Sequence, residues 1–172
     1  LLDSLLANAH HGGAITLNVG PMRDGTFQQA AKRRLREFAA WMEINESALQ
    51  PTRRSPFAKD ALPAEVRATL GPADAPPHFN LFLLRPLPAG EFTLPQPLRL
   101  PDSSVEFRAQ VLETRQWLDV RRDARGDLVI TIPAALAAID HPVVRVGPAT
   151  SFAHVYEDGV PVEPVVPARF HR

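Results

Sequence analysis

Residues 13–26 have the sequence GAITLNVGPMRDGT, and they carry the clearest fold signal in the chain. Ala14 to Val19 form a short apolar run of the kind that is buried in parallel sheets. Gly20-Pro21 ends this run, and Asp24-Gly25 predicts a turn directly after it. The stretch therefore predicts one buried strand followed by a loop.

Helical patterns flank the predicted strand on both sides. Residues 1–9 have apolar helix spacing, which His10-His11-Gly12-Gly13 breaks. Thr26 and Gln29 have the spacing of a capping box, which opens a second helix. The apolar stripe of that helix consists of Ala31, Leu35, Phe38, Met42 and Leu49. One strand with two helices would leave these stripes in water, so the pattern indicates part of a larger α/β assembly. Because Leu1 lies inside a helical pattern, we expect the chain to be cut from a longer protein.

The second half of the chain has β periodicity. Pro51 to His78 are rich in Pro and Ala, which predicts a connection with room for one short helix between Pro63 and Gly71. From Phe79 onward apolar residues alternate with polar ones, as in half-buried strands. Strands are expected at residues 80–85, 91–94, 104–111, 117–121, 127–132, 143–146 and 152–156, with the spacing of an antiparallel sandwich. Arg122 to Gly126 is the expected hairpin loop, with Gly126 at positive φ.

The amino-acid composition of the chain limits the kinds of molecule that it is expected to bind. The 172 residues are 45% hydrophobic and 22% charged, which is typical of a globular chain with a packed core. Lys+Arg and Asp+Glu balance at 19 each, so we expect neither nucleic acid nor a membrane as partner. No window has the roughly 18 to 20 continuous apolar residues of a membrane span. The absence of cysteine excludes disulfides, thiolate metal sites and a cysteine nucleophile, but leaves the compartment open.

The stretch from Gly13 to Thr26 resembles a signature of the retaining α-L-fucosidases, glycoside hydrolase family 29, at strand eight of their catalytic barrel. The similarity continues through the helix at residues 34–49 to Thr52-Arg53, and more loosely through Asn80 to Leu84, Gly90 to Pro95 and Leu128 to Pro133. Ala14 stands where the family usually has Asn, and Gln50-Pro51 replaces a Tyr-Gly.

The resemblance implies a fold and a parent activity. The fold class is an α/β remnant, the last strand and flanking helices of a TIM barrel, followed by an all-β antiparallel sandwich. Residues 1–56 would be the C-terminal end of the barrel, and residues 79–172 would form the C-terminal sandwich domain. Residues 57–78 would be the Pro- and Ala-rich linker between the two. The parent protein would be an exo-acting hydrolase that releases terminal α-L-fucose from glycans with retention, and a periplasmic or secreted location is favoured. Its partners would be a fucosylated glycan and the missing upstream barrel segment.

Candidate site residues are few. The resemblance places the family's nucleophilic Asp on an earlier strand and implies that this chain lacks the catalytic carboxylates, so no catalytic residue is assigned in it. Neither a cofactor nor a metal is expected. Asn18 is the one substrate-binding candidate, because the carboxyl ends of barrel strands face the active site. The alternative is that Asn18 only caps the Gly20-Pro21 turn. His10-His11 lacks acidic partners at metal-ligand spacing, and Asp123 to Asp127 suits a hairpin turn better than a calcium loop.

Two further points stay open at the sequence level. Trp41 and Trp117 are candidates for stacking on sugar rings, although Trp41 lies beside the apolar stripe and is expected to pack against the barrel. The alternative function is that the chain acts by itself as a carbohydrate-binding or structural β-sandwich module. No clustered aromatic platform favours sugar binding by the sandwich.

Overall fold

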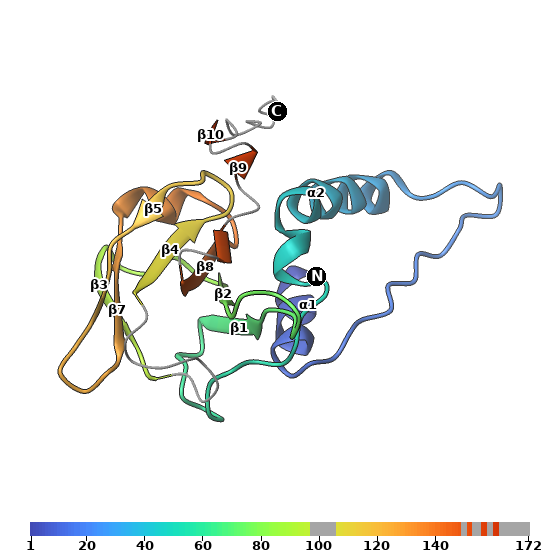
Figure 1. The fold of residues 1–172 in the computed structure, drawn as a ribbon. Helices are drawn as coiled ribbons and strands as arrows, with labels where there is room; N and C mark the ends of the chain where they lie inside the picture. Colours follow the sequence, from blue (N-terminus) through green and yellow to red (C-terminus); the bar gives the residue numbers. More distant parts are fainter. Residues whose placement is uncertain (97–105, 149–150, 153–155, 158–159, 162–172) are drawn as a thin grey trace.

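A helical part lies beside a β-rich part in the computed structural model, which describes residues 1–96, 106–148, 151–152, 156–157 and 160–161 (Figure 1). The helices are α1 (Leu2–His10) and α2 (Gln29–Asn45), and the short 3-10 helices are η1 (Glu46–Ala48) and η2 (Ala134–Ala138). The strands are β1 (Val66–Leu70), β2 (Phe79–Leu83), β3 (Gly90–Leu94), β4 (Phe107–Val111), β5 (Trp117–Leu118), β6 (Val120–Arg122), β7 (Leu128–Ile132), β8 (Val143–Pro148), β9 (Tyr156–Glu157) and β10 (Val160–Pro161).

The described strands form a five-stranded sheet, a three-stranded sheet and a two-stranded pair. The five-stranded sheet has the order β1-β2-β8-β4-β5, the three-stranded sheet has the order β3-β7-β6, and β9 pairs with β10. All the pairings are antiparallel. The late strand β8 therefore lies between two strands that precede it in the sequence. We use the name β domain for the part of the chain from β1 to β8.

The two larger sheets share one hydrophobic core. Leu81, Ala109 and Val144 on the five-stranded sheet belong to the same buried cluster as Leu128 and Ile130 on the three-stranded sheet. Successive strand residues point to opposite faces, so the odd-numbered residues of β2 supply this core. The prediction of an antiparallel β-rich domain in the second half of the chain is thereby confirmed.

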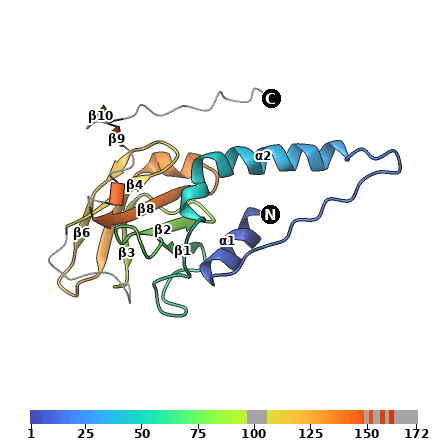
Figure 2. The ribbon, with the colours of Figure 1, turned by 45° about the vertical axis from the view of Figure 1, so that its right-hand side comes forward.

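The opposite face of the five-stranded sheet is covered by the helices. Phe82 of β2 and Val143 of β8 form a second buried cluster with Leu6 of α1, Trp41 of α2 and Ala48 of η1. Figures 1 and 2 show both helices on this side of the sheet. Because β2 meets the core on one face and the helices on the other, all five of its residues are buried.

Two predicted elements differ in the structure. Residues 14–19 were expected to form a strand, but they are extended without pairing to any described residue, because a strand needs a neighbour and none lies beside them. The short helix considered between Pro63 and Gly71 is wrong, since Val66–Leu70 is β1 and pairs with β2 over its whole length. Pairing and burial of alternate side chains outweigh the helix propensity of the alanine-rich sequence.

The other predicted elements agree more closely. The helix expected at residues 1–9 is α1, and the second predicted helix is α2 followed by η1. Strands overlap the predicted runs at residues 80–85, 91–94, 117–121, 127–132 and 143–146, with ends that differ by one or two residues. In the run at 104–111 the strand begins at Phe107, and residues 104–105 lie outside the described part. In the run at 152–156, Phe152 belongs to a short 3-10 turn, Tyr156 begins β9, and residues 153–155 are outside the description.

Candidate functional site

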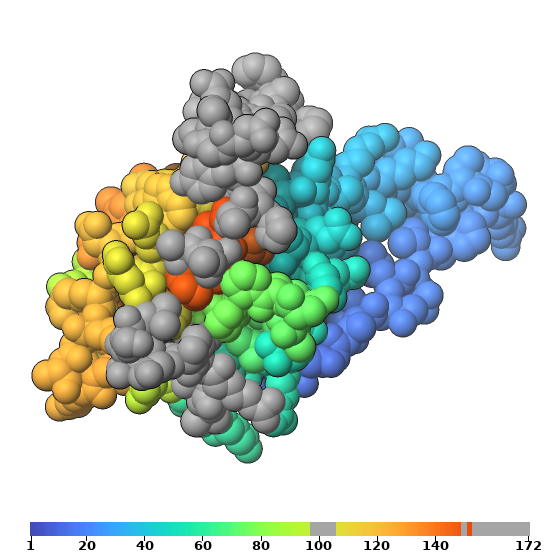
Figure 3. Space-filling view, viewed as in Figure 1, coloured from blue at the N-terminus to red at the C-terminus, as the bar shows by residue number. Residues whose placement is uncertain are grey.

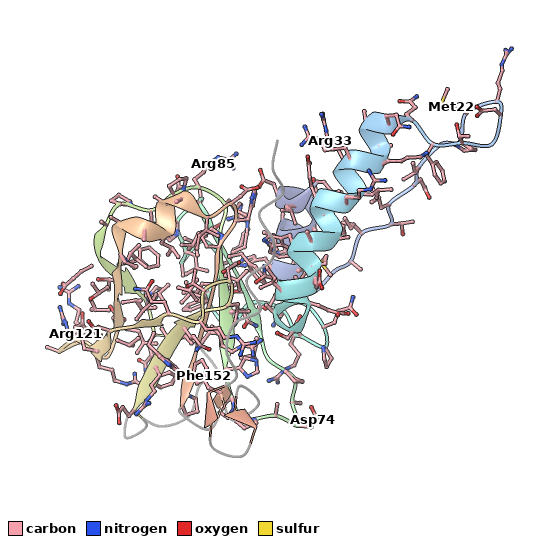
Figure 4. All side chains as sticks on the ribbon, turned by 90° about the horizontal axis from the view of Figure 1, so that it is seen from above. Met22, Arg33, Asp74, Arg85, Arg121 and Phe152 are labelled. Atoms are coloured by element: carbon pink, nitrogen blue, oxygen red, sulfur yellow. The ribbon has the colours of Figure 1, made fainter. Side chains whose placement is uncertain are left out.

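The segment between α1 and α2 projects from the rest of the molecule. Residues 13–28 run away from the end of α1 and return through α2, and the space-filling view shows them standing out in blue (Figure 3). Figure 4 places Met22 at the tip of this segment, at the opposite end of the molecule from Arg121 of β6. We call residues 13–28 the projecting segment.

A hydrogen-bonded turn forms the tip of the projecting segment. The N–H of Met22 donates to the carbonyl oxygen of Thr26 at 2.7 Å, and Gly25 adopts φ 79°. Asp24 Oδ1 accepts from the N–H of Thr26 at 3.0 Å and from its hydroxyl at 2.8 Å. These bonds from Thr26 lower the pKa of the Asp24 carboxyl. Thr26 is thereby engaged in the turn, so the predicted capping box is wrong. The N-cap of α2 is Gln28, without a side-chain capping bond.

Large apolar side chains gather on this exposed segment. Leu17, Met22 and Phe27 are 45%, 48% and 42% exposed, and Leu1 at the start of α1 is 49% exposed. Four of the five large apolar side chains that are exposed in the described residues thus lie within residues 1–27. Such a concentration is typical of a surface that another part of a protein covers.

Asn18 lies in a shallow groove between the projecting segment and the first turns of α2. The groove has a volume of about 380 Å³ and is lined by Leu1, Leu17, Asn18, Val19, Gly20, Gln28, Ala31, Arg34 and Leu35. The side chain of Asn18 is exposed and forms no hydrogen bond with any described residue. Its amide is therefore available to a ligand or to another protein segment. Neither sugar contact nor the turn-capping alternative is tested by this arrangement, and both remain predictions.

His10 supports the sheet edge. Its Nδ1 accepts a hydrogen bond from the N–H of Ala68 at 3.1 Å, on the edge of β1 that faces away from β2. Its ring meets that of His11 edge to face, with the centroids 4.9 Å apart. Desolvation lowers the pKa of His10, and the nearby His11 adds to the effect. Among the described residues, no three His, Cys, Asp or Glu side chains are grouped so that they could hold a metal ion.

The two tryptophans have different surroundings. Trp41 is buried against Phe82 of β2, with a ring separation of 6.4 Å, and its Nε1–H donates to the carbonyl oxygen of His141 at 3.1 Å. The same buried cluster contains Leu6 of α1, so Trp41 packs between α1 and the β domain, and the expectation that it packs against the barrel stays a prediction. Trp117 is 39% exposed, and its ring contacts Phe152 and the guanidinium of Arg108.

Ionic contacts fix α1 on the β domain. Asp3 Oδ1 lies 2.7 Å from Nε2 of His141, whose Nδ1 lies 2.7 Å from Asp140 Oδ1. Arg85 approaches Asp3 Oδ2 at 3.4 Å. The hydrogen bond with His141 is the main cause that lowers the pKa of Asp3. The sequence analysis missed this network, because Asp3 and His141 are 138 residues apart and neither has a local signature.

A half-buried carboxylate under the end of α2, that of Glu113, was missed in the same way. Both carboxylate oxygens of Glu113 accept from the N–H of Val143, at 3.1 and 3.2 Å. Desolvation raises the pKa of Glu113 to about 6, against the opposing hydrogen bonds from backbone N–H groups and Asn45. Asn45 Oδ1 has no hydrogen-bond partner among the described atoms although it is buried. This carboxyl group lies within the contact between α2 and the β domain.

The Asp123 to Asp127 loop is a hairpin turn, as predicted. Asp123 Oδ1 accepts from the N–H groups of Arg125 and Asp127, at 2.8 and 3.0 Å, and Gly126 has φ 85°. Asp127 Oδ1 accepts from the N–H of Gln96 at 3.0 Å. The carboxylates therefore accept hydrogen bonds from backbone N–H groups and stabilise the turn.

No helix of the described residues has both the length and the apolar character for crossing a membrane.

Comparisons with known proteins agree on one family. The model of the α-L-fucosidase family matches residues 1–47. Plasma α-L-fucosidase of Pongo abelii is 29% identical over 97 residues, which are 56% of this chain and 20% of that protein. Plasma α-L-fucosidase of Homo sapiens is 28% identical over 74 residues, which are 43% and 16% of the two chains. The chain thus spans about a fifth of the curated relatives it matches.

Solved structures share the fold. An α-fucosidase of Thermotoga maritima has a TM-score of 0.63 at 22% identity, over 84% of this chain and 33% of its own. A GH29 α-L-fucosidase of Bacteroides thetaiotaomicron, trapped as a covalent intermediate, has a TM-score of 0.69 at 18% identity, over 84% and 31%. Isoenzyme 1 of Paenibacillus thiaminolyticus has a TM-score of 0.68 at 21% identity, over 86% and 33%. The family match to residues 1–47, the plasma enzymes and the shared fold thus make the α-L-fucosidases the proteins that this chain resembles.

Proposed function

We propose that the protein containing this chain is an exo-acting glycosidase that removes terminal α-L-fucose from glycans with retention. The observation that carries the proposal is the stretch from Gly13 to Thr26, which lies inside the family match to residues 1–47. The substrate class is a fucosylated glycan or oligosaccharide. A neutral sugar suits a chain whose formal net charge is zero.

Retention requires two carboxyl groups roughly 5 to 5.5 Å apart, one as nucleophile and one as acid and then base. The Bacteroides thetaiotaomicron enzyme was trapped as a covalent intermediate with 2-fluoro-fucosyl fluoride, and a covalent intermediate is what a retaining nucleophile forms. For the protein studied here we place both carboxylates outside residues 1–172. The described residues would then support the reaction by closing the barrel and by positioning Asn18.

Residues 1–56 are proposed to be the last strand and flanking helices of an eight-stranded catalytic barrel. Residues 14–19 support this, because all but Ile15 and Val19 are exposed and their backbone lacks strand pairing in the described chain. Neighbouring barrel strands would satisfy these N–H and C=O groups and cover Leu17. Residues 57–78 would connect the barrel to a sandwich at residues 79–172, with β1 as a strand inside that connection.

Fusing the upstream barrel segment to this chain tests the proposal. We expect the fusion to hydrolyse an aryl α-L-fucoside and to release α-L-fucose as the first anomer seen by NMR. An aryl β-L-fucoside is the matched control and should not react. A well-folded fusion, judged by circular dichroism, that leaves the α-fucoside intact would contradict the proposed activity.

Replacement of Asn18 tests its proposed contact with a sugar hydroxyl. In the full-length protein, Asn18→Ala should lower kcat/KM about tenfold, because a hydrogen bond in a water-poor site is worth about 1 to 1.5 kcal/mol. Thr16→Ala, two residues earlier on the same exposed segment, is the control and should change kcat/KM less than twofold. A fall in Tm at unchanged kcat/KM would instead assign Asn18 to the Gly20-Pro21 turn.

The contacts of the helices weigh against the alternative of a stand-alone β module at residues 79–172. Such a module would lack β1 and would expose Phe82 and Val143, which α1 and α2 cover here. Exposure of that apolar face carries a cost of roughly 25 cal/mol for each Å². We therefore assign the β domain a structural role in the larger protein.

A further inference from the structure

A second groove lies where the end of α1 meets the segment that leads into the β domain. It has a volume of about 510 Å³, and the histidine and charged residues in its lining are His10, His11, Arg53, Arg54, Lys59 and Asp60. Asn18 belongs to a different groove, between the projecting segment and α2. We call the second groove the basic groove.

Backbone contacts hold the walls of the basic groove in place. Arg53 forms an antiparallel bridge with Leu70, in which each N–H donates to the other carbonyl, at 2.7 and 3.0 Å. The N–H of Ser55 donates to the carbonyl oxygen of His10 at 2.9 Å. Gly12, at φ 80°, lies so close to Arg54 that an added Cβ would come within 3.2 Å of Arg54 Cβ. The basic residues are therefore presented by a backbone that is tied to β1 and to α1.

Positive charge is concentrated in this groove although the whole chain is neutral. Arg53, Arg54 and Lys59 are permanently charged at neutral pH, and Asp60 is the one carboxylate in the lining. Within the described part of the chain, none of these four side chains forms an ion pair. Arg53 uses Nε to bind the carbonyl oxygen of Gly71 at 2.9 Å, which leaves its two terminal nitrogen atoms available.

His10 adds a neutral donor to the same lining. Because Nδ1 accepts from Ala68, the proton of the neutral ring must sit on Nε2, which is then an N–H donor. Desolvation lowers the pKa of His10, so the ring stays neutral at pH 7. The groove thus offers guanidinium, ammonium and imidazole N–H groups and a single opposing carboxylate.

We propose that the basic groove binds an oxyanion, a sulfate or phosphate group. Planar guanidinium groups donate pairs of hydrogen bonds to such oxygens, and ammonium adds a point charge. The group could be an ester on a glycan or the free inorganic ion, and the two share the chemistry that the groove recognises. Binding at this place is separate from hydrolysis, so it stands or falls independently of the proposed glycosidase activity.

Calorimetric titration of the full-length protein tests the proposal. The probes are sodium sulfate, sodium phosphate and a sulfated fucan oligosaccharide, with uncharged L-fucose as the control ligand. Arg54→Gln with Lys59→Gln removes two exposed cations and should weaken oxyanion binding about tenfold, as expected for the loss of two solvent-exposed charge contacts. Arg36→Gln with Arg125→Gln removes the same charge from α2 and the hairpin turn, and should leave binding unchanged.

The outcomes separate the sources of the oxyanion. Tighter binding of the oligosaccharide than of sulfate supports a glycan ester, and equal binding supports the free ion. In both cases about 0.5 M NaCl should abolish the signal by screening. The proposal is overturned if no probe binds, or if both double variants bind equally well. Hydrolysis of an uncharged aryl fucoside should be the same in both double variants. A loss of turnover in the Arg54→Gln, Lys59→Gln variant alone would contradict the separation of oxyanion binding from hydrolysis.

Discussion

Phe82→Ala should lower the free energy of unfolding of this chain by about 3 to 5 kcal/mol. The Phe82 side chain is fully buried and joins Leu6, Trp41 and Val143 in the cluster between the helices and the sheet. Its removal leaves a cavity that rigid strands on either side cannot close, and the lost contacts are those that hold α1 and α2. Urea unfolding followed by fluorescence measures the change.

A second aromatic residue provides the control for Phe82. Phe92→Ala on β3 removes the same atoms from a half-buried position and should cost less than half as much. Both variants are made in a Trp117→Phe background, so that Trp41 is the remaining tryptophan. Its emission should shift to the red in native Phe82→Ala, because water reaches the ring when the helices loosen. Equal losses for the two variants, with no shift, would contradict a helix attachment centred on Phe82.

Glu113→Gln should make the chain more stable at neutral pH by about 2 kcal/mol. Desolvation raises the pKa of Glu113 from 4.5 to about 6 in the folded chain. A raised folded pKa contributes stability that is complete below the unfolded pKa and is lost as the pH rises through the folded one. One pKa unit corresponds to about 1.4 kcal/mol, so about 2 kcal/mol should disappear between pH 4.5 and pH 7. The amide stays neutral, and it also brings a donor near Asn45 Oδ1.

The measurement is the difference in unfolding free energy between wild type and Glu113→Gln at several pH values. A difference is needed because His10 and His78, whose pKa values are lowered by desolvation, titrate nearby with the opposite sign. Glu106→Gln, which removes an exposed carboxylate just before β4, is the charge-matched control. A difference curve that is flat from pH 4.5 to pH 7 would show that Glu113 is not desolvated as described.

Local pattern predicted most of the β domain, because alternate burial leaves a period-two signal in each strand. It failed at β1. Val66, Ala68 and Leu70 are apolar at alternate positions, as in a strand, but the surrounding alanines and prolines favour a loop or a short helix. Pairing with β2 determines that residues 66–70 form a strand. A short sequence window around β1 does not contain this partner. The same limit explains residues 14–19, whose apolar run predicts a strand that has no neighbour to pair with here.

The candidate site was predictable only in part. Asn18 was singled out because it lies at the carboxyl end of the predicted barrel strand, and the structure places it in an exposed groove beside Arg34 and Leu35. The ionic contact of Asp3 with His141 and the burial of Glu113 arise between residues 30 to 138 positions apart. Such partners follow from the way α1 and α2 dock on the sheet, which no local spacing encodes.

The position of β8 between β2 and β4 has a consequence for synthesis on the ribosome. Residues 143–148 supply the middle of the five-stranded sheet, so β1-β2 and β4-β5 remain separate pairs until these residues have emerged. The docking surface for α1 and α2 needs Val143 beside Phe82, one translated late and the other early. The two helices are synthesised first and cannot dock until β8 has been made. During that delay their apolar stripes are exposed to chaperones and to aggregation.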